Sequence, residues 1–125
     1  MLHVNLCLGW VWITVGFISG AVVGMFFYDP DWLGGYDTWR RRMVRLGHIS
    51  FLGTGLINLA FVFTCAIRED QSPPQVASWL FAVGALTMPL VCFLAAWRDG
   101  LRYLFPIPVA SLIGAGIALI AQGLL

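Results

Sequence analysis

The stretch that decides the fold is VNLCLGWVWITVGFISGAVVGMFF, residues 4–27, which contains no acidic or basic side chain. An α-helix rises about 1.5 Å per residue, so about 20 apolar residues cross a hydrocarbon core about 30 Å thick. Three further tracts of this kind follow, at residues 46–67, 78–97 and 103–125. The pattern predicts an all-α integral membrane protein, a four-transmembrane-helix bundle with up-down-up-down topology.

Composition indicates the same fold class. Of the 125 residues, 60% are hydrophobic and 10% are charged, whereas charged residues make up about 25% of a soluble domain. We expect a single transmembrane domain over residues 1–125, with an interfacial loop at residues 28–45. Residues 4–27 lack a basic n-region and exceed the length of a signal-peptide core, so we expect a retained helix. The net charge of +1 gives no reason to expect nucleic acid as a partner.

The arginines predict the orientation. In an up-down-up-down bundle, the loops after the first and third helices lie on the same side of the membrane. Opposite them, the second loop carries only Arg68. Because positive loops stay on the cytoplasmic side, we expect both termini outside, in a bacterial inner membrane. The first and third loops carry the other six arginines: Arg40, Arg41, Arg42, Arg45, Arg98 and Arg102.

Small residues predict where the helices pack. Membrane helices associate through close backbone approach and polar contacts, because lipid tails are as apolar as leucine. The first helix carries glycines and the fourth carries small residues at four-residue spacing. We expect these stripes to pack inside the bundle, and the alternative is contact with a neighbouring subunit. Pro89 leaves the carbonyl of Ala85 without its helical partner, so we expect a kink there and a neighbouring donor. The two stripes are Gly16, Gly20 and Gly24, and Ala110, Gly114 and Ala118.

The second helix has a polar face that should point inward. Ser50, Thr54 and Asn58 fall on one side at 3.6 residues per turn. An amide in hydrocarbon needs a hydrogen-bond partner, so Asn58 is expected to bond to another helix. The alternatives are that Asn58 contacts a bound cofactor or quinone, or that the three side chains line a pathway for a small neutral molecule.

His48 is the most informative titratable residue, because it lies just inside the second helix. One hypothesis makes it an axial ligand of haem b iron, with nearby arginines pairing the propionates. His3 should lie at the opposite membrane face, so a second ligand would come from Met43, Met88, water or another chain. The alternatives are a hydrogen bond to a loop or phospholipid, a quinone contact, or a proton relay. The arginines concerned are Arg41, Arg42 and Arg45.

Two other groups leave alternatives open. His3 and Cys7 lie one turn apart, and Cys65 should lie at a similar depth, so a Cys7–Cys65 disulfide, a metal site and inert packing are all compatible with the spacing. The arginines of residues 28–45 are expected to bind lipid phosphates and neighbouring aspartates, and the alternative is docking onto a larger complex.

No motif dictates a reaction. The sequence contains no nucleophile elbow, phosphate-binding glycine loop, HExxH or paired CxxC, and no carboxylate lies within the apolar tracts. We expect no catalytic activity of its own. The leading hypothesis is an accessory subunit of a larger bacterial electron-transfer or energy-converting complex, with other membrane subunits and phospholipids as partners and a contact to haem, quinone or pigment. The alternatives are a stand-alone channel or carrier for a small neutral molecule and a complex assembly factor.

Overall fold

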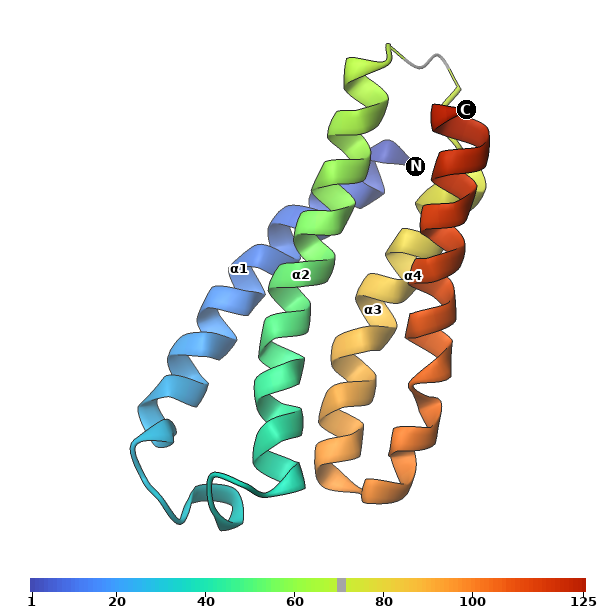
Figure 1. Ribbon diagram of the computed structural model, residues 1–125. Helices are drawn as coiled ribbons and strands as arrows, with labels where there is room; N and C mark the ends of the chain where they lie inside the picture. Colours follow the sequence, from blue (N-terminus) through green and yellow to red (C-terminus); the bar gives the residue numbers. More distant parts are fainter. Residues whose placement is uncertain (70–71) are drawn as a thin grey trace.

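The computed structural model describes residues 1–69 and 72–125 and contains four long helical segments (Figure 1). They are α1 (Leu2–Phe27), α2 (Trp39–Ile67), α3 (Gln75–Trp97) and α4 (Pro106–Leu119). Short helical segments lie between and beside them. The segment η1 (Trp32–Gly34) lies in the loop between α1 and α2, and η2 (Asp99–Leu104) and η3 (Ile120–Leu124) precede and follow α4. Both termini lie at one end of the molecule, as the up-down-up-down topology requires.

Each segment is long and apolar enough to cross a bilayer. The spans contain 26, 29 and 23 residues for the first three helices and 24 for Asp99–Gln122, against the roughly 20 that a crossing needs. The predicted all-α bundle is confirmed, and the protein is a multi-pass membrane protein.

Asp37 and Thr38 predict a cap for a helix that begins before the apolar tract of residues 46–67, and α2 begins there. It starts at Trp39 rather than at residue 46, so four arginines lie on the helix and not in the loop. The hydroxyl of Thr38 caps this end by accepting a hydrogen bond from the backbone amide of Arg41 at 3.3 Å. The charged side chains mark the edge of the hydrocarbon, and the N-terminal part of α2 extends beyond that edge.

The helices pack in chain order and form an open arrangement. Helix α2 lies between α1 and α3, and α4 packs chiefly against α3. Helix α1 touches α3 over a short length only, and it buries just Asn5, Gly9 and Gly16. One apolar cluster at the end that carries the termini includes Phe61 and Phe81. The bundle therefore has two ends that can be compared, one with the termini and one with the arginines.

The glycine stripe of α1 packs on α2 over part of its length. A Cβ atom at Gly16 would lie 2.6 Å from the side chain of Leu52, and one at Gly20 would lie 2.5 Å from the imidazole of His48. Gly24 has nothing within 4 Å, so α1 has moved away from α2 there. The predicted internal packing thus holds for two of the three glycines.

The stripe on α4 agrees with the prediction in part. A Cβ atom at Gly114 would lie 3.3 Å from the side chain of Leu80 on α3. Ala118 packs against the apolar cluster around Phe61, whereas Ala110 is exposed. The buried positions are Pro108, Ser111 and Ala115. Because α4 packs chiefly against α3, its packed face is narrow. Small size at a position does not by itself show which face is turned inward.

Helix α3 continues through Pro89, and the carbonyl that this proline frees has a partner. The indole of Trp12 on α1 donates a hydrogen bond to the carbonyl oxygen of Ala85 at 2.6 Å. This is the neighbouring donor that the sequence predicted without identifying it. Trp12 thereby fixes the depth of α1 against α3.

Candidate site at the arginine end of helix α2

Arg41 is fully buried and closes the end of α1. Its guanidinium donates hydrogen bonds to the backbone carbonyls of Phe27, Asp29 and Trp32, the last two at 2.9 and 3.3 Å. The rings of Phe27 and Tyr36 lie 4.3 and 3.9 Å from its carbon Cζ. The last carbonyls of a helix have no helical donors and carry partial negative charge, so a cation is favoured there. Arg41 therefore holds the first loop against α1.

Trp39 and Arg40 make the same kind of contact with α3. The indole of Trp39 donates to the carbonyl of Ala95 at 2.8 Å, and Nε of Arg40 donates to the carbonyl of Ala96 at 3.1 Å. Because α1 and α3 both end beside the start of α2, three consecutive side chains of α2 bond to carbonyls at the ends of both neighbours. This part of the arginine cluster is structural.

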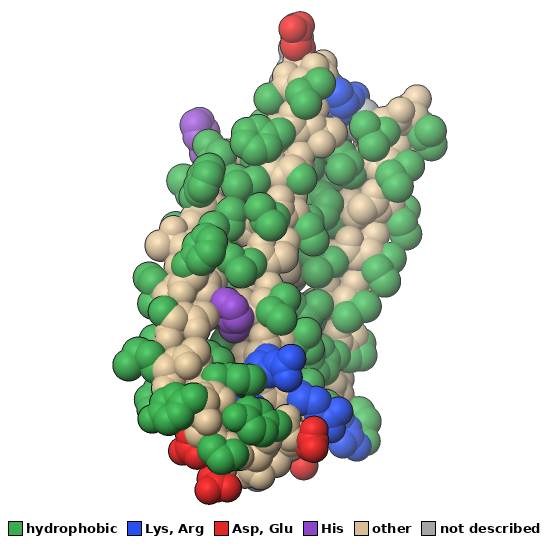
Figure 2. Space-filling view, turned by 60° about the vertical axis from the view of Figure 1, so that its left-hand side comes forward, with side chains coloured by type: hydrophobic (Ala, Val, Ile, Leu, Met, Phe, Trp, Pro, Cys, Tyr) green, Lys and Arg blue, Asp and Glu red, His purple; other side chains and the backbone are tan. Residues whose placement is uncertain are grey.

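Arg42 and Arg45 are exposed, as is Arg40, but they do not bond to α3. Arg42 donates to the carbonyl of Asp37 at 3.4 Å, and the guanidinium carbon of Arg45 lies 5.5 Å above the ring of Phe27. Within residues 1–69 and 72–125, neither guanidinium forms an ion pair with a carboxylate. Figure 2 shows basic side chains gathered at this end of the molecule, below a largely hydrophobic face. These two charges are available to a ligand.

His48 is half-buried and turned toward α1. Its Nδ1 lies 3.1 Å from Oγ of Ser19, in a hydrogen bond, and a Cβ atom at Gly20 would lie 3.0 Å from its Nε2. The imidazole itself fills the space that the glycine leaves, and both ring nitrogens face α1. His3 belongs to the opposite end of the bundle (Figure 1). This packing does not fit an axial ligand of haem iron, and the haem hypothesis stays a prediction.

Asn58 takes part in a buried network that joins three helices. Its amide nitrogen donates to the carbonyls of Thr54 and Phe81, at 2.9 and 3.2 Å, and its amide oxygen accepts from Asn5 at 2.8 Å. Asn5 also donates to the carbonyl of Ser78 at 3.0 Å and accepts from the Ser78 hydroxyl. Both amide hydrogens of Asn58 are therefore engaged inside the protein, and a cofactor could bind them only by displacing these bonds.

The other members of the polar face are also engaged within α2. Ser50 donates to the carbonyl of Gly47 at 2.7 Å, and Thr54 donates to the carbonyl of Ser50 at 2.6 Å. Ser50, Thr54 and Asn58 are all buried.

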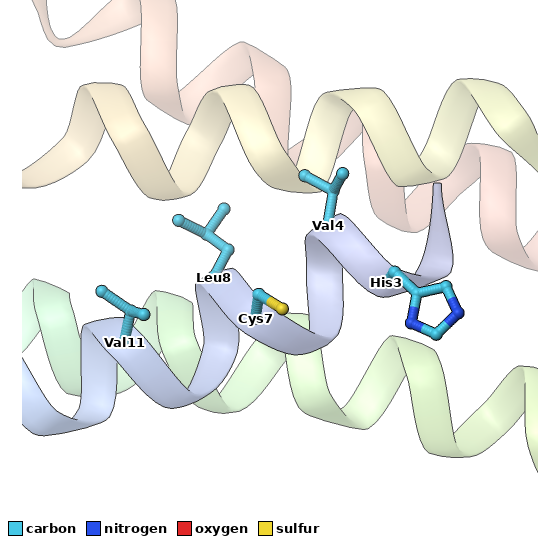
Figure 3. Close-up of a pocket in the computed structure, with 5 residues that line it drawn as sticks. All are labelled: His3, Val4, Cys7, Leu8 and Val11. Atoms are coloured by element: carbon cyan, nitrogen blue, oxygen red, sulfur yellow. The ribbon is translucent and has the colours of Figure 1, made fainter.

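The structure does not bring together His3, Cys7 and Cys65. Figure 3 shows a shallow apolar groove lined by residues of α1 alone, among them His3 and Cys7. Cys7 is exposed and forms no disulfide, whereas Cys65 is buried in the apolar cluster. In the part of the chain that the structure describes, no group of three or more His, Cys, Asp or Glu side chains is placed to hold a metal ion.

Sequence reasoning missed three partners. Asn5, Trp12 and Ser78 take part in the hydrogen bonds that join α1 to α2 and α3 at the end with the termini and in the middle of the bundle. Polarity gives one signal, because an asparagine within an apolar tract needs a partner and two such asparagines are candidates for each other. No sequence signal pairs Trp12 with Ala85.

Comparisons with protein-family models, curated proteins and solved structures find no match to this chain.

Proposed function

We propose that the protein is an accessory subunit of a larger membrane complex and that it binds its neighbours through the outer face of α1. The observation that carries this proposal is the exposure of α1, a 26-residue helix that buries only three residues in the bundle. Its outer face presents large hydrophobic side chains, including Trp10 and Phe17, which are 57% and 69% exposed. Such a face is suited to contact with another membrane helix.

Two further features support a contact with protein. The groove of Figure 3, with a volume of about 410 Å³, runs along α1 and can receive side chains of a neighbouring helix. Outward glycines, Gly24 on α1 and Gly53 on α2, have nothing within 4 Å. Glycine at such positions permits close approach of another helix backbone.

The parent complex proposed from the sequence belongs to the electron-transfer or energy-converting class of a bacterial inner membrane. The exposed position of Arg45 supports this assignment, because its guanidinium can contact a haem, quinone or pigment held by a partner. His48 lies one turn away on α2, with both ring nitrogens facing α1.

The carrier alternative receives less support. A pathway needs polar groups that are free to exchange partners with the solute, whereas Ser50, Thr54 and Asn58 are buried and bonded within the protein. None of these three side chains borders the groove on α1 or the depression beside Arg42 and Arg45.

Photo-crosslinking tests the proposal in native membranes. A photoreactive amino acid at Val11, which lines the α1 groove, is compared with the same amino acid at Ile117 on the exposed face of α4. We expect defined higher-mass adducts from Val11 and few from Ile117. Reduced-minus-oxidised spectra of the co-purified complex test its class.

Three results would contradict the proposal. Purification as a monomer without adducts from Val11, adducts only to a second copy of the chain, or solute flux after reconstitution in liposomes would each reject the accessory-subunit role. Stable partners without cytochrome, quinone or pigment would reject the electron-transfer class and leave the subunit role in place.

A further inference from the structure

The arginines of α2 divide into two pairs with different environments. Arg40 and Arg41 donate to carbonyls at the ends of α3 and α1. Arg42 and Arg45 face outward and, among the described residues, meet no carboxylate. The sequence predicted that the cluster as a whole binds lipid phosphates. In the structure Arg41 is buried and Nε of Arg40 bonds to α3, whereas within the described parts of the chain Arg42 and Arg45 form no hydrogen bond to a neighbouring helix.

The side chains of these two arginines border a depression in the surface of α2. Arg42, Arg45, Leu46 and Ile49 line it, and its volume is about 220 Å³. The four positions follow the spacing i, i+3, i+4 and i+7, which places them on one helix face. From Arg42 to Ile49 the helix rises about 10 Å. Charge lies at the outer end and aliphatic surface lies toward the apolar part of α2, which is the order of head group and acyl chain in a phospholipid.

Across residues 1–69 and 72–125, no carboxylate forms an ion pair with Arg42 or Arg45. Arg41, one residue from Arg42, is buried and bonds to backbone carbonyls only, and its Nε has no hydrogen-bond partner. Carbonyl dipoles favour the cation but do not neutralise it. Leu46 and Ile49 are 41% and 55% exposed, so the aliphatic part of the depression is open to lipid.

We propose that Arg42 and Arg45 bind the phosphodiester of an anionic phospholipid and that Leu46 and Ile49 contact its acyl chain. Guanidinium groups hydrogen-bond phosphate oxygens in pairs, and two arginines one turn apart present two such forks. If the arginine end faces the cytoplasm, as the positive-inside rule predicts, the adjoining leaflet is the one whose anionic lipids attract basic segments. The site shares Arg45 with the proposed cofactor contact but has no residue in common with the α1 groove, so crosslinking at Val11 and lipid binding can fail separately.

Native mass spectrometry of the full chain in detergent, titrated with phosphatidylglycerol or phosphatidylcholine, tests the proposal. We expect phosphatidylglycerol to be retained in preference. The double variant Arg42→Gln/Arg45→Gln should bind it about 30-fold more weakly, since each arginine near an anionic surface contributes about fivefold. The matched control is Arg98→Gln/Arg102→Gln, which removes two exposed charges from the same end of the bundle and should keep the affinity.

Three results would contradict the lipid site. Equal weakening by both double variants would show general surface charge in place of a site. Displacement of the lipid by millimolar inorganic phosphate would show a free-anion site in which the aliphatic residues have no part. Equal retention of the two lipids would show that charge does not select the ligand.

Discussion

The two ends of α1 are held to the bundle by different chemistry. At the end with the termini, α1 lies against α2 and α3 and is joined to them by neutral amides and a hydroxyl, among Asn5, Asn58 and Ser78. At the other end α1 has moved away from α2, as the open space at Gly24 shows, and a buried arginine bonds to carbonyls where the helix stops.

The cost of transfer into hydrocarbon explains this difference. A charged side chain is expensive at membrane depth, while neutral amides that bond to each other leave no unsatisfied group. Near the head groups, the free carbonyls at a helix end offer a cation favourable partners, and water is close. Each end therefore uses the polar group that its depth tolerates, and substitutions at the two ends should have effects of different size.

The largest effect is expected at Arg41. Arg41→Met removes hydrogen bonds to three backbone carbonyls, so we expect the free energy of unfolding in detergent to fall by about 3 kcal/mol. Protease cleavage between Tyr28 and Thr38 should rise as the loop detaches. Arg42→Met, at an exposed neighbour, should change stability by at most about 0.5 kcal/mol. Equal losses from the two variants would contradict the division between structural and free arginines.

The second-largest effect is expected at Asn58, in the amide network at the end with the termini. Asn58→Leu leaves Asn5 without one of its partners, and we expect a loss of about 2 kcal/mol in unfolding free energy. A double-mutant cycle with Asn5→Leu should give a coupling of about 0.6–1.7 kcal/mol, the range for interhelical bonds in membranes. Thr64→Val is the control, because Thr64 bonds only to its own helix at Ala60. A coupling near zero would mean that the amides act separately.

Trp12 lies between the two ends and tests whether its bond compensates for Pro89. Trp12→Phe removes the donor to Ala85, so a loss of about 1.5 kcal/mol is expected in the same unfolding assay. In the background of Pro89→Ala the loss should shrink, because residue 89 then has an amide that can bond to Ala85 within the helix. The exposed Trp10→Phe is the matched control. An unchanged loss in the Pro89→Ala background would show that Trp12 acts through packing alone.

The sequence predicted the elements of this fold better than their contacts. Four uncharged tracts and about 20 residues per crossing were enough for the helix number and topology. The tract at residues 46–67 predicted the part of α2 that crosses the hydrocarbon, because arginines mark its edge, and Thr38 caps the longer helix that starts at Trp39. The site was predicted at Arg45 and His48, yet sequence spacing alone could not show that Arg41 is buried or that the imidazole fills the space at Gly20. Those facts depend on the angle at which α1 crosses α2.

The smallest effect tests that crossing directly. Gly20→Ala places a Cβ atom 2.5 Å from Cε1 of His48, so the imidazole must turn away from Ser19, and we expect a loss of about 1 kcal/mol in unfolding free energy. Gly24→Ala meets nothing within 4 Å and should be neutral or stabilising by up to about 1 kcal/mol, because alanine favours the helix over glycine. The two alanines are thus expected to have opposite signs although they lie one turn apart. Destabilisation of similar size at both positions would show that α1 follows α2 along its whole length, and the contrast between its two ends would then be wrong.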